Sequence, residues 1–299
     1  MSNVYAYGMV SHSTVYLLRS DFRFPKANTY AEVAEILTSI GGEASNSAIV
    51  LSKLGLSTKL DGNWLPARHA AAVREVLSQY GIDVTRLTES DAFGTDEVVI
   101  ADGETRTVFG NYAAFHDGPR QWNDAHPDDI QQADIVCLDP YFREESRKAA
   151  ELCVQFNTPY VTLDCRFDDM IARNAAAIVI SHELRDQAYA GHDLGEVFLN
   201  YQATCKGLVV FTFGADCTWY ARPGQRRKTH IPYKIDPLDT TGAGDSFRGA
   251  IAYGLLQNWS DEKVLQFASA VAACVCLTRP HALNAPNLAG VLEFMRTHE

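Results

Sequence analysis

The sequence predicts an α/β fold: a doubly wound, mostly parallel sheet with helices on both faces and a small β-rich lid. Short apolar runs of the length of buried strands alternate with helical patterns through most of the chain. Hydrophobic residues make up 46% and charged residues 21% of the 299 residues, so the chain can bury a large core. Residues 15–40 and 93–109 interrupt the alternation, and we expect the lid to come from them.

The strand and helix signals follow one another in the order that βαβ units require. Pro66 suits the first turn of a helix that begins at residue 67, because the amide hydrogen that proline lacks would be unpaired there. The expected strands are 4–10, 58–61, 134–139, 160–164, 176–180 and 207–213, and the expected helices are 44–54, 67–80, 144–156 and 243–257.

The lid is predicted from a hairpin signal. Two β-rich arms flank Asp102-Gly103, a dipeptide typical of tight hairpin turns. An antiparallel hairpin between βαβ units predicts a small subdomain over one end of the sheet, and long insertions of this type are often lids. We therefore expect a nucleotide- and substrate-binding core of residues 1–14, 41–92 and 110–299, with a lid of residues 15–40 and 93–109.

The net charge and the cysteine content predict the kind of binding partner and the cellular compartment. The formal net charge of −11 repels phosphate backbones and anionic lipids, so we expect a small-molecule partner and neither nucleic acid nor membrane. The seven cysteines are odd in number and form no Cys-x-x-Cys pair, which suits reduced thiols better than disulfides or zinc. No signal peptide is apparent and no apolar stretch is long enough to span a bilayer, so we expect a cytoplasmic protein.

The most informative motif is the glycine-rich segment Asp239–Ala250, which leads into the helix expected at 243–257. Small residues at Gly242, Ala243 and Gly244 let backbone amides approach a ligand, and the helix N-terminus adds unpaired donors and a positive partial charge. Such a loop is an anion hole for phosphate. Asp245, in the first turn, is kept ionised by the same dipole and is available to accept a proton. A glycine-rich loop alone is also a common packing solution, and this one is neither a P-loop nor a dinucleotide motif.

The segment resembles the C-terminal signature of the ribokinase-like carbohydrate kinase family. Four further segments resemble that family in the same order along the chain: Gly41–Asn46, Asp102–Thr107, Asp164–Arg166 and Thr212–Ala215. The chain is thus identified as a divergent member. The resemblance implies an ATP-dependent kinase that phosphorylates a hydroxyl of a sugar or sugar derivative.

The resemblance also implies roles for individual residues. Asp245 would deprotonate the acceptor hydroxyl, with the anion hole formed by Gly242, Ala243 and Gly244. The implied cofactors are ATP and Mg²⁺, with K⁺ as an optional monovalent cation. The implied contacts are Gly42 and Asn46 with the sugar, Thr212, Gly214, Gly242 and Gly244 with ATP, Glu183 with Mg²⁺, and Asp239 and Thr241 with the monovalent cation.

The chain departs from the family where the first strand usually ends in an aspartate that holds sugar hydroxyls. Ser13 occupies that position, next to His12. A hydroxyl holds a sugar less firmly than a carboxylate and makes room for an anionic substrate. His12 is either a replacement ligand for the substrate or a strand-end histidine at the surface. Arg106 and Arg166 would bind an acid group on the substrate if they face the cleft, and otherwise form structural ion pairs.

Two alternatives remain at this stage. A nucleoside kinase of the same fold would need aromatic residues to stack on a base, and Tyr112 and Phe115 follow the hairpin. A catalytically silent sugar- or nucleotide-binding protein would keep the fold without turnover. The exposed edges of a β-rich lid also favour a homodimer formed through the lid.

Overall fold

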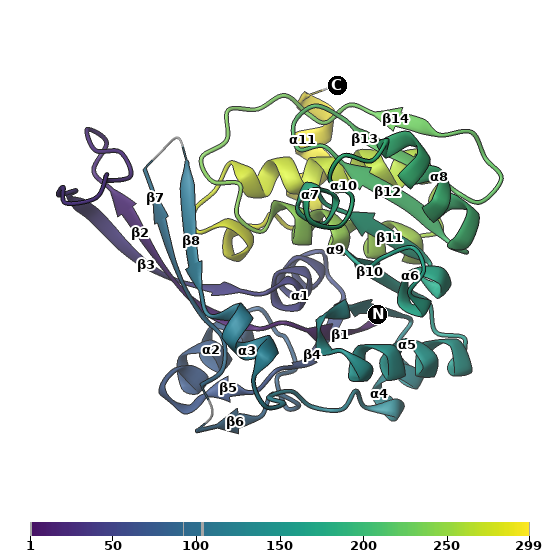
Figure 1. Ribbon diagram of the computed structural model, residues 1–299, viewed down its shortest axis with the longest axis horizontal. Helices are drawn as coiled ribbons and strands as arrows, with labels where there is room; N and C mark the ends of the chain where they lie inside the picture. The colour runs from purple at the N-terminus through teal and green to yellow at the C-terminus, as the bar shows by residue number, and fades with distance from the viewer. Residues whose placement is uncertain (1, 92, 103–104, 299) are drawn as a thin grey trace.

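The computed structural model describes residues 2–91, 93–102 and 105–298, and it has an α/β core from which a smaller sheet projects (Figure 1). The central sheet has eight strands in the order β14-β13-β12-β11-β10-β9-β1-β4. The strands from β4 to β12 in this order pair in parallel, while β13 and β14 are antiparallel. The expected mostly parallel α/β sheet is therefore confirmed. The strand bounds are β1 Asn3–Gly8, β4 Ser57–Gly62, β9 Ile135–Leu138, β10 Tyr160–Leu163, β11 Ala177–Ile180, β12 Leu208–Thr212, β13 Thr218–Ala221 and β14 Lys228–His230.

Helices cover both faces of the central sheet because its strands are apolar on both sides. Along β1, Val4 and Ala6 belong to one hydrophobic cluster and Tyr5 and Tyr7 to the other. The first cluster includes residues of α1 (Glu43–Lys53), α2 (Ala67–Gln79), α9 (Ala243–Leu256), α10 (Asp261–Cys276) and α11 (Leu288–Thr297). The second includes residues of α3 (Tyr112–Asp117), α4 (Pro127–Gln132), α5 (Glu144–Phe156), α6 (Met170–Asn174) and α8 (Leu194–Thr204), while α7 (His182–Ala188) packs at its margin.

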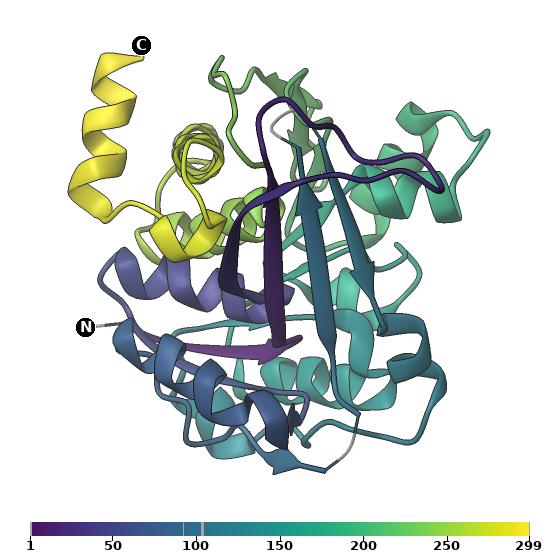
Figure 2. The same ribbon diagram turned by 90° about the vertical axis from the view of Figure 1, so that its left-hand side faces the viewer.

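The smaller sheet has four strands in the order β3-β2-β7-β8, which lie side by side in Figure 2. Its bounds are β2 Ser11–Leu18, β3 Val33–Gly41, β7 Asp96–Ala101 and β8 Arg106–Gly110. Residues 15–40 and 93–109 thus contribute to one sheet. Gly103 and Glu104, in the expected hairpin turn, lie outside the described residues. A two-stranded sheet of β5 (Leu65–Pro66) and β6 (Glu89–Ser90) connects the core to β7.

The two faces of the smaller sheet differ. Val15 and Val99 lie in its buried apolar cluster, together with Leu17 and Ala101. Val98 and Phe109, paired across β7 and β8, are 37% and 51% exposed on the opposite face. We call the face that carries Val15 and Val99 the inner face, and the face that carries Val98 and Phe109 the outer face.

The first strand is shorter than expected. The sequence predicts a strand at 4–10, but β1 ends at Gly8. The backbone amide of Met9 donates to Asp139 Oδ2 at 2.7 Å and that of Val10 donates to Asn63 Oδ1 at 2.7 Å. Side chains take over the backbone pairing here because the chain leaves the central sheet to enter β2.

Among the described residues, no helix combines the length and the apolar character needed to cross a membrane.

Candidate active site

Asp245 lies in the first turn of α9, directly after the glycine-rich loop. Gly242 precedes the helix with φ of 67°, a left-handed conformation that glycine adopts at little cost. Asn46 Nδ2 on α1 donates to Asp245 Oδ2 at 2.9 Å, and Ser47 Oγ donates to the Asp245 carbonyl at 3.0 Å. Asn46 therefore holds the carboxylate, and Ser47 the backbone, of Asp245 at the helix N-terminus, where unpaired amides face outward.

Gly42 brings α1 close to the end of β1. Its φ is 97°, and a Cβ atom added there would lie 2.3 Å from the Met9 carbonyl oxygen. Both the conformation and the close approach require glycine at this position. The close approach holds the N-terminus of α1, and with it Asn46, against the strand that leads into the smaller sheet.

A buried ion pair lies beneath Asp245. The Arg248 guanidinium bonds to Asp139 Oδ1, and both side chains are 0% exposed. Arg248 also donates to Ser47 Oγ at 2.9 and 3.1 Å and to the Glu43 carbonyl at 2.8 Å. Burial alone would lower the pKa of Arg248, but the nearby Asp139, Cys137 and Asp245 together raise it above its ordinary value. The pair joins α9, α1 and the end of β9, and so sets the position of Asp245 relative to Asn46.

Carboxyl groups gather around this pair. Burial raises the pKa of Glu43 well above its ordinary value, and the charges of Asp139 and Asp245 raise it further. Burial likewise raises the pKa of Asp164, with a contribution from the charges of Glu183 and Asp245, although Ser181 N and Oγ each donate to it at 2.7 Å.

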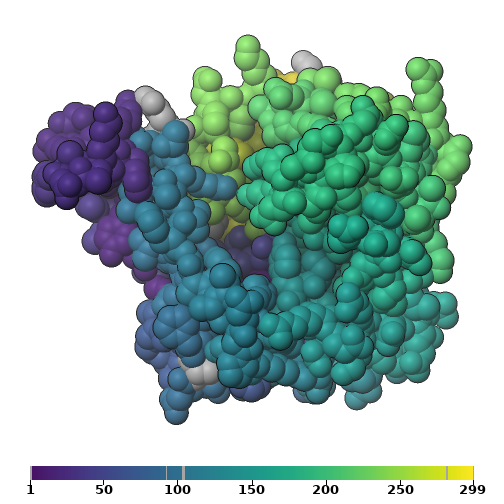
Figure 3. Space-filling model, in the orientation of Figure 1, coloured from purple at the N-terminus to yellow at the C-terminus, as the bar shows by residue number. Residues whose placement is uncertain are grey.

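The inner face of the smaller sheet adds another carboxylate. Ser13 is paired in register with Glu97 of β7, and the Tyr112 hydroxyl donates to Glu97 Oε2 at 2.7 Å. Ser13 Oγ and Asn46 Oδ1 are buried without a hydrogen-bond partner among the residues that the structure describes. Unsatisfied buried polar atoms of this kind suit contacts with a ligand. The surface is hollowed between the smaller sheet and the C-terminal half of the core (Figure 3).

His12 has a different environment from Ser13. Successive strand residues face opposite sides of a sheet, so His12 lies on the outer face. Its Nδ1 atom is 3.1 Å from Asp96 Oδ1, and its ring stacks on that of His69 from α2. The structure therefore does not bring His12 and Ser13 together.

The expected nucleotide turn follows β12. Thr212 is the last residue of the strand, and Gly214 has φ of 59° with open space where a Cβ atom would be. Phe213, between them, lies under the Arg185 guanidinium of α7 at 4.0 Å from its ring centroid. Glu183, on the first turn of α7, is exposed.

The remaining expected residues are separated. Arg106 Nη1, on the inner face, lies 3.8 Å from Asp239 Oδ1 across the hollow. The same oxygen accepts from Thr241 N at 2.8 Å and Thr241 Oγ1 at 2.6 Å. Arg166 is exposed and pairs with Asp168 at 3.3 Å, so it takes part in a surface ion pair.

Glu43, Glu97, Asp139 and Arg248 were not identified as site residues from the sequence. Arg248 lies inside the glycine-rich segment, but its partner Asp139 is 109 residues away in the chain. Glu97 lies in the hairpin arm, where its pairing with Ser13 depends on a parallel contact between distant strands. A carboxylate directly after an apolar strand, as at Asp139, was the available signal.

The chain is similar to known proteins in sequence and in fold. The family profile for pfkB family carbohydrate kinases matches residues 1–287. The chain is 26% identical over 270 residues to 1-phosphofructokinase of Escherichia coli K12, covering 84% of this chain and 85% of that protein. It is 24% identical over 289 residues to ribokinase of Bacillus subtilis, covering 91% and 92%.

Two solved structures show the same fold. A candidate ribokinase from Agrobacterium tumefaciens superposes with a TM-score of 0.86 at 20% identity, over 99% of this chain and 98% of that one. Arabidopsis thaliana ribokinase, complexed with ribose and ATP, gives a TM-score of 0.79 at 17% identity, over 99% and 98%.

Proposed function

The chain belongs to the pfkB family of carbohydrate kinases, and on that premise we propose that it transfers the γ-phosphate of ATP to a hydroxyl of a neutral sugar, with Asp245 as the general base. The observation that carries the proposal is the position of Asp245, which is held by Asn46 at the N-terminus of α9. Phosphoryl transfer depends mainly on positioning and on charge stabilisation, and both are available at this place.

In the proposed mechanism, Asp245 accepts the proton of the attacking hydroxyl. The amides of Gly242, Ala243 and Gly244 stabilise the negative charge that develops on the transferred phosphoryl group, since the dipole of α9 points toward it. Asn46 orients the carboxylate of Asp245. The nucleotide would lie along Thr212 and Gly214, because Gly214 has no side chain and leaves open space there.

The carboxyl groups of Asp164 and Glu183 fit a magnesium ion. Burial and, to a smaller extent, the charge of Glu183 raise the pKa of Asp164, and a divalent cation bound with ATP would relieve the repulsion between the two carboxyl groups. Mg²⁺ would neutralise charge on the phosphates when bound. Asp239 and Thr241 fit K⁺ less well, because Asp239 Oδ1 already accepts two hydrogen bonds from Thr241 and faces Arg106.

The charges around the acceptor side support a neutral sugar over an acidic one. Glu97 and Asp245 are acidic, and the charge of Glu97 helps to raise the pKa of Tyr112, although burial is the larger cause. Sugar hydroxyls can donate to carboxylates, whereas an acid group would be repelled. Of the two arginines that could have bound an acid group, Arg166 pairs with Asp168 at the surface, and Arg106, on the inner face, has the Asp239 carboxylate 3.8 Å away as its counter-charge.

A nucleoside acceptor has less support. Phe115 is 0% exposed and packs against Trp122, with ring centroids 5.6 Å apart, so it is not available to stack on a base. The Tyr112 hydroxyl is bonded to Glu97.

We also propose a homodimer formed through the smaller sheet, acting as a lid, and a cytoplasmic location. Ile36, Val98 and Phe109 expose apolar surface on the outer face, which a second copy would cover. All seven cysteines are free, as expected in a reducing compartment. Light scattering of the purified protein would show a monomer mass if the dimer proposal is wrong.

The acceptor proposal is tested by measuring ADP release with ATP and magnesium. Neutral aldoses, ketoses and polyols are compared with the sugar acids of matched chain length and with nucleosides. We expect the highest kcat/KM for a neutral sugar. A sugar acid or a nucleoside at the top of the ranking would overturn the acceptor class. Tight ATP binding without release of ADP for any acceptor would instead indicate a silent binding protein.

A further inference from the structure

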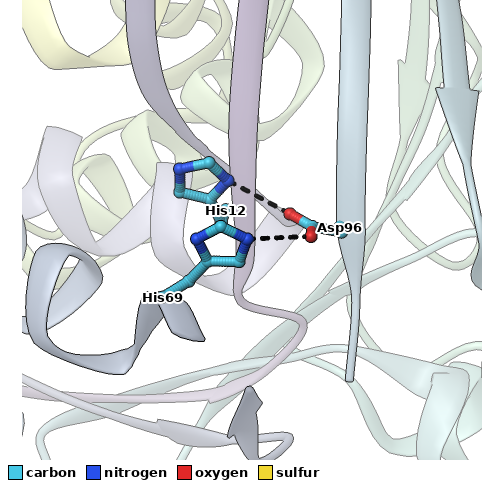
Figure 4. A group of neighbouring side chains, drawn as sticks. All are labelled: His12, His69 and Asp96. Atoms are coloured by element: carbon cyan, nitrogen blue, oxygen red, sulfur yellow. Dashed lines mark hydrogen bonds and ion pairs between the residues drawn. The ribbon is translucent and has the colours of Figure 1, made fainter. Parts of the chain in front are cut away.

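Two histidines and an aspartate gather at the root of the lid, on the face that points away from the candidate active site. Figure 4 shows His12 of β2 and His69 of α2 with their rings stacked, both directed at Asp96, the first residue of β7. The ring centroids are 3.9 Å apart at an interplanar angle of 3°. His12 Nδ1 lies 3.1 Å from one carboxylate oxygen of Asp96, and His69 Nε2 lies 3.0 Å from the other.

We propose that His12, His69 and Asp96 bind a divalent transition-metal ion of the Zn²⁺ class, at a site separate from the nucleotide. Two imidazoles and one carboxylate are a ligand set that such ions prefer, and Mg²⁺ does not. The three side chains come from three different elements and present their ligand atoms within 4.8 Å of one another. Water would complete the coordination.

The donor atoms need only a small adjustment. A tetrahedral ion with bonds of about 2.1 Å holds its ligand atoms about 3.4 Å apart, and the three ligand atoms already lie within 4.8 Å of one another. The two nitrogens that face the carboxylate carry hydrogens when they donate to it. If each ring shifts its proton to its other nitrogen, both lone pairs turn toward Asp96 without a change in net charge. The rings must also tilt out of their parallel stack for the lone pairs to converge.

Burial and charge at the site act in opposite directions. The side chains of His12, His69 and Asp96 are 12%, 25% and 29% exposed, so an ion would be partly shielded yet reachable from solvent. Arg68 Nη2 lies 2.9 Å from Asp96 Oδ2 and places a positive charge next to the proposed ion. That charge should weaken metal binding, so a substitution that removes it should strengthen binding.

The position of the site indicates what a bound ion would do. His69 belongs to a helix of the core, whereas His12 and Asp96 belong to two lid strands that pair in register. A metal ion bound to all three would therefore cross-link the lid to the core at its root. Binding to the folded state alone raises the apparent stability of the protein.

The experiment uses the full chain without an affinity tag, stripped of metal by a chelator and titrated with Co²⁺ while visible absorption is followed. His69→Gln keeps a side-chain amide that can donate to Asp96 but removes the imidazole ligand. We expect Co²⁺ affinity to fall by at least about 100-fold, since even changes behind the direct ligands cost 10–100-fold. Asp96→Asn should lower Co²⁺ affinity by a similar factor, and Arg68→Gln should bind Co²⁺ up to roughly tenfold more tightly than the wild type. The control is His192→Gln, at an exposed histidine elsewhere, and it should bind like the wild type.

Thermal unfolding gives the second readout. Zn²⁺ should raise Tm of the wild type and of His192→Gln, but not of His69→Gln, and all variants should share the wild-type Tm within a few degrees in chelator. Absence of a Co²⁺ absorption band in the wild type overturns the proposal. So does equal Co²⁺ affinity in the wild type and in both ligand variants, because the ion would then be bound elsewhere.

Discussion

Replacing Arg248 by methionine tests the buried ion pair beneath Asp245. Methionine has a similar length but no charge, so the variant leaves the Asp139 carboxylate buried with the Met9 amide as its described hydrogen-bond donor. Removing one partner of a buried pair costs about 3–5 kcal/mol, most of it from the uncompensated charge. The hydrogen bonds from Arg248 to Ser47 and to the Glu43 carbonyl are lost as well. We expect the free energy of unfolding to fall by about 4 kcal/mol at neutral pH.

The pH dependence distinguishes a charge effect from a packing effect. Burial raises the pKa of Asp139, and in the wild type Arg248 opposes the rise. Without Arg248 the folded-state pKa rises further above the unfolded value. A group with a raised folded pKa stabilises the protein below its unfolded pKa, and this contribution is lost as the pH rises through the folded value. The deficit of Arg248→Met should therefore be larger at pH 8 than at pH 5, by on the order of 1–3 kcal/mol.

Urea unfolding of the wild type, Arg248→Met, Asp139→Asn and the double variant at both pH values measures these differences. The double variant should recover part of the loss at pH 8, because no unpaired charge remains. A deficit that is equal at pH 5 and pH 8, or a double variant no more stable than Arg248→Met, would refute the reasoning from charge.

Three further predictions concern the active site. Asp245→Asn should keep ATP affinity within a factor of about two but lower kcat by roughly 10²–10⁴-fold, the usual contribution of a positioned base. The control Asp168→Asn, at the surface, should leave kcat unchanged. A wild-type kcat in Asp245→Asn would remove this residue from the mechanism. Glu43→Gln should gain stability relative to the wild type between pH 5 and 8, because Glu43 has a raised pKa and its stabilising contribution is lost as the pH rises; parallel urea midpoints would contradict this. Gly42→Ala should lower the free energy of unfolding by about 1–3 kcal/mol more than Gly55→Ala, since Gly55 has a similar φ of 90° but no atom within 4 Å of an added Cβ. Equal losses would mean that the Met9 carbonyl moves away to make room for the new methyl group.

The sequence was sufficient to predict the fold because its signals are local. Apolar runs such as 207–213 and the helix after the glycine-rich loop depend on neighbours in the chain, and they lie where expected as β12 and α9. The proposed role of Asp245 could be predicted for the same reason, since the glycine-rich loop and the helix start around it form one continuous segment. The acceptor side depends instead on contacts between distant residues. The bond between Asn46 and Asp245 spans 199 residues and that between Arg248 and Asp139 spans 109, and no local pattern encodes either.

Strand alternation explains why His12 and Ser13 could not be told apart in the sequence. They are neighbours in β2, and one residue of shift in the expected strand exchanges their faces. The structure places Ser13 beside Glu97 and His12 beside Asp96. The end of β1 at Gly8, two residues earlier than expected, depends on side chains of Asp139 and Asn63 that lie far along the chain.

The parallel pairing of β2 with β7 has a consequence for the order of folding. Each half of the smaller sheet, β2 with β3 and β7 with β8, is an antiparallel pair of strands close in sequence. The two halves meet through β2 and β7, which are separated in the chain by α1, β4, α2 and the short strands between them. Contacts between distant segments form late because the intervening chain must first be ordered. We expect the core segments between the halves to compact before β2 pairs with β7. The amides that bond across β2 and β7 should be among the first to exchange when the native protein opens locally.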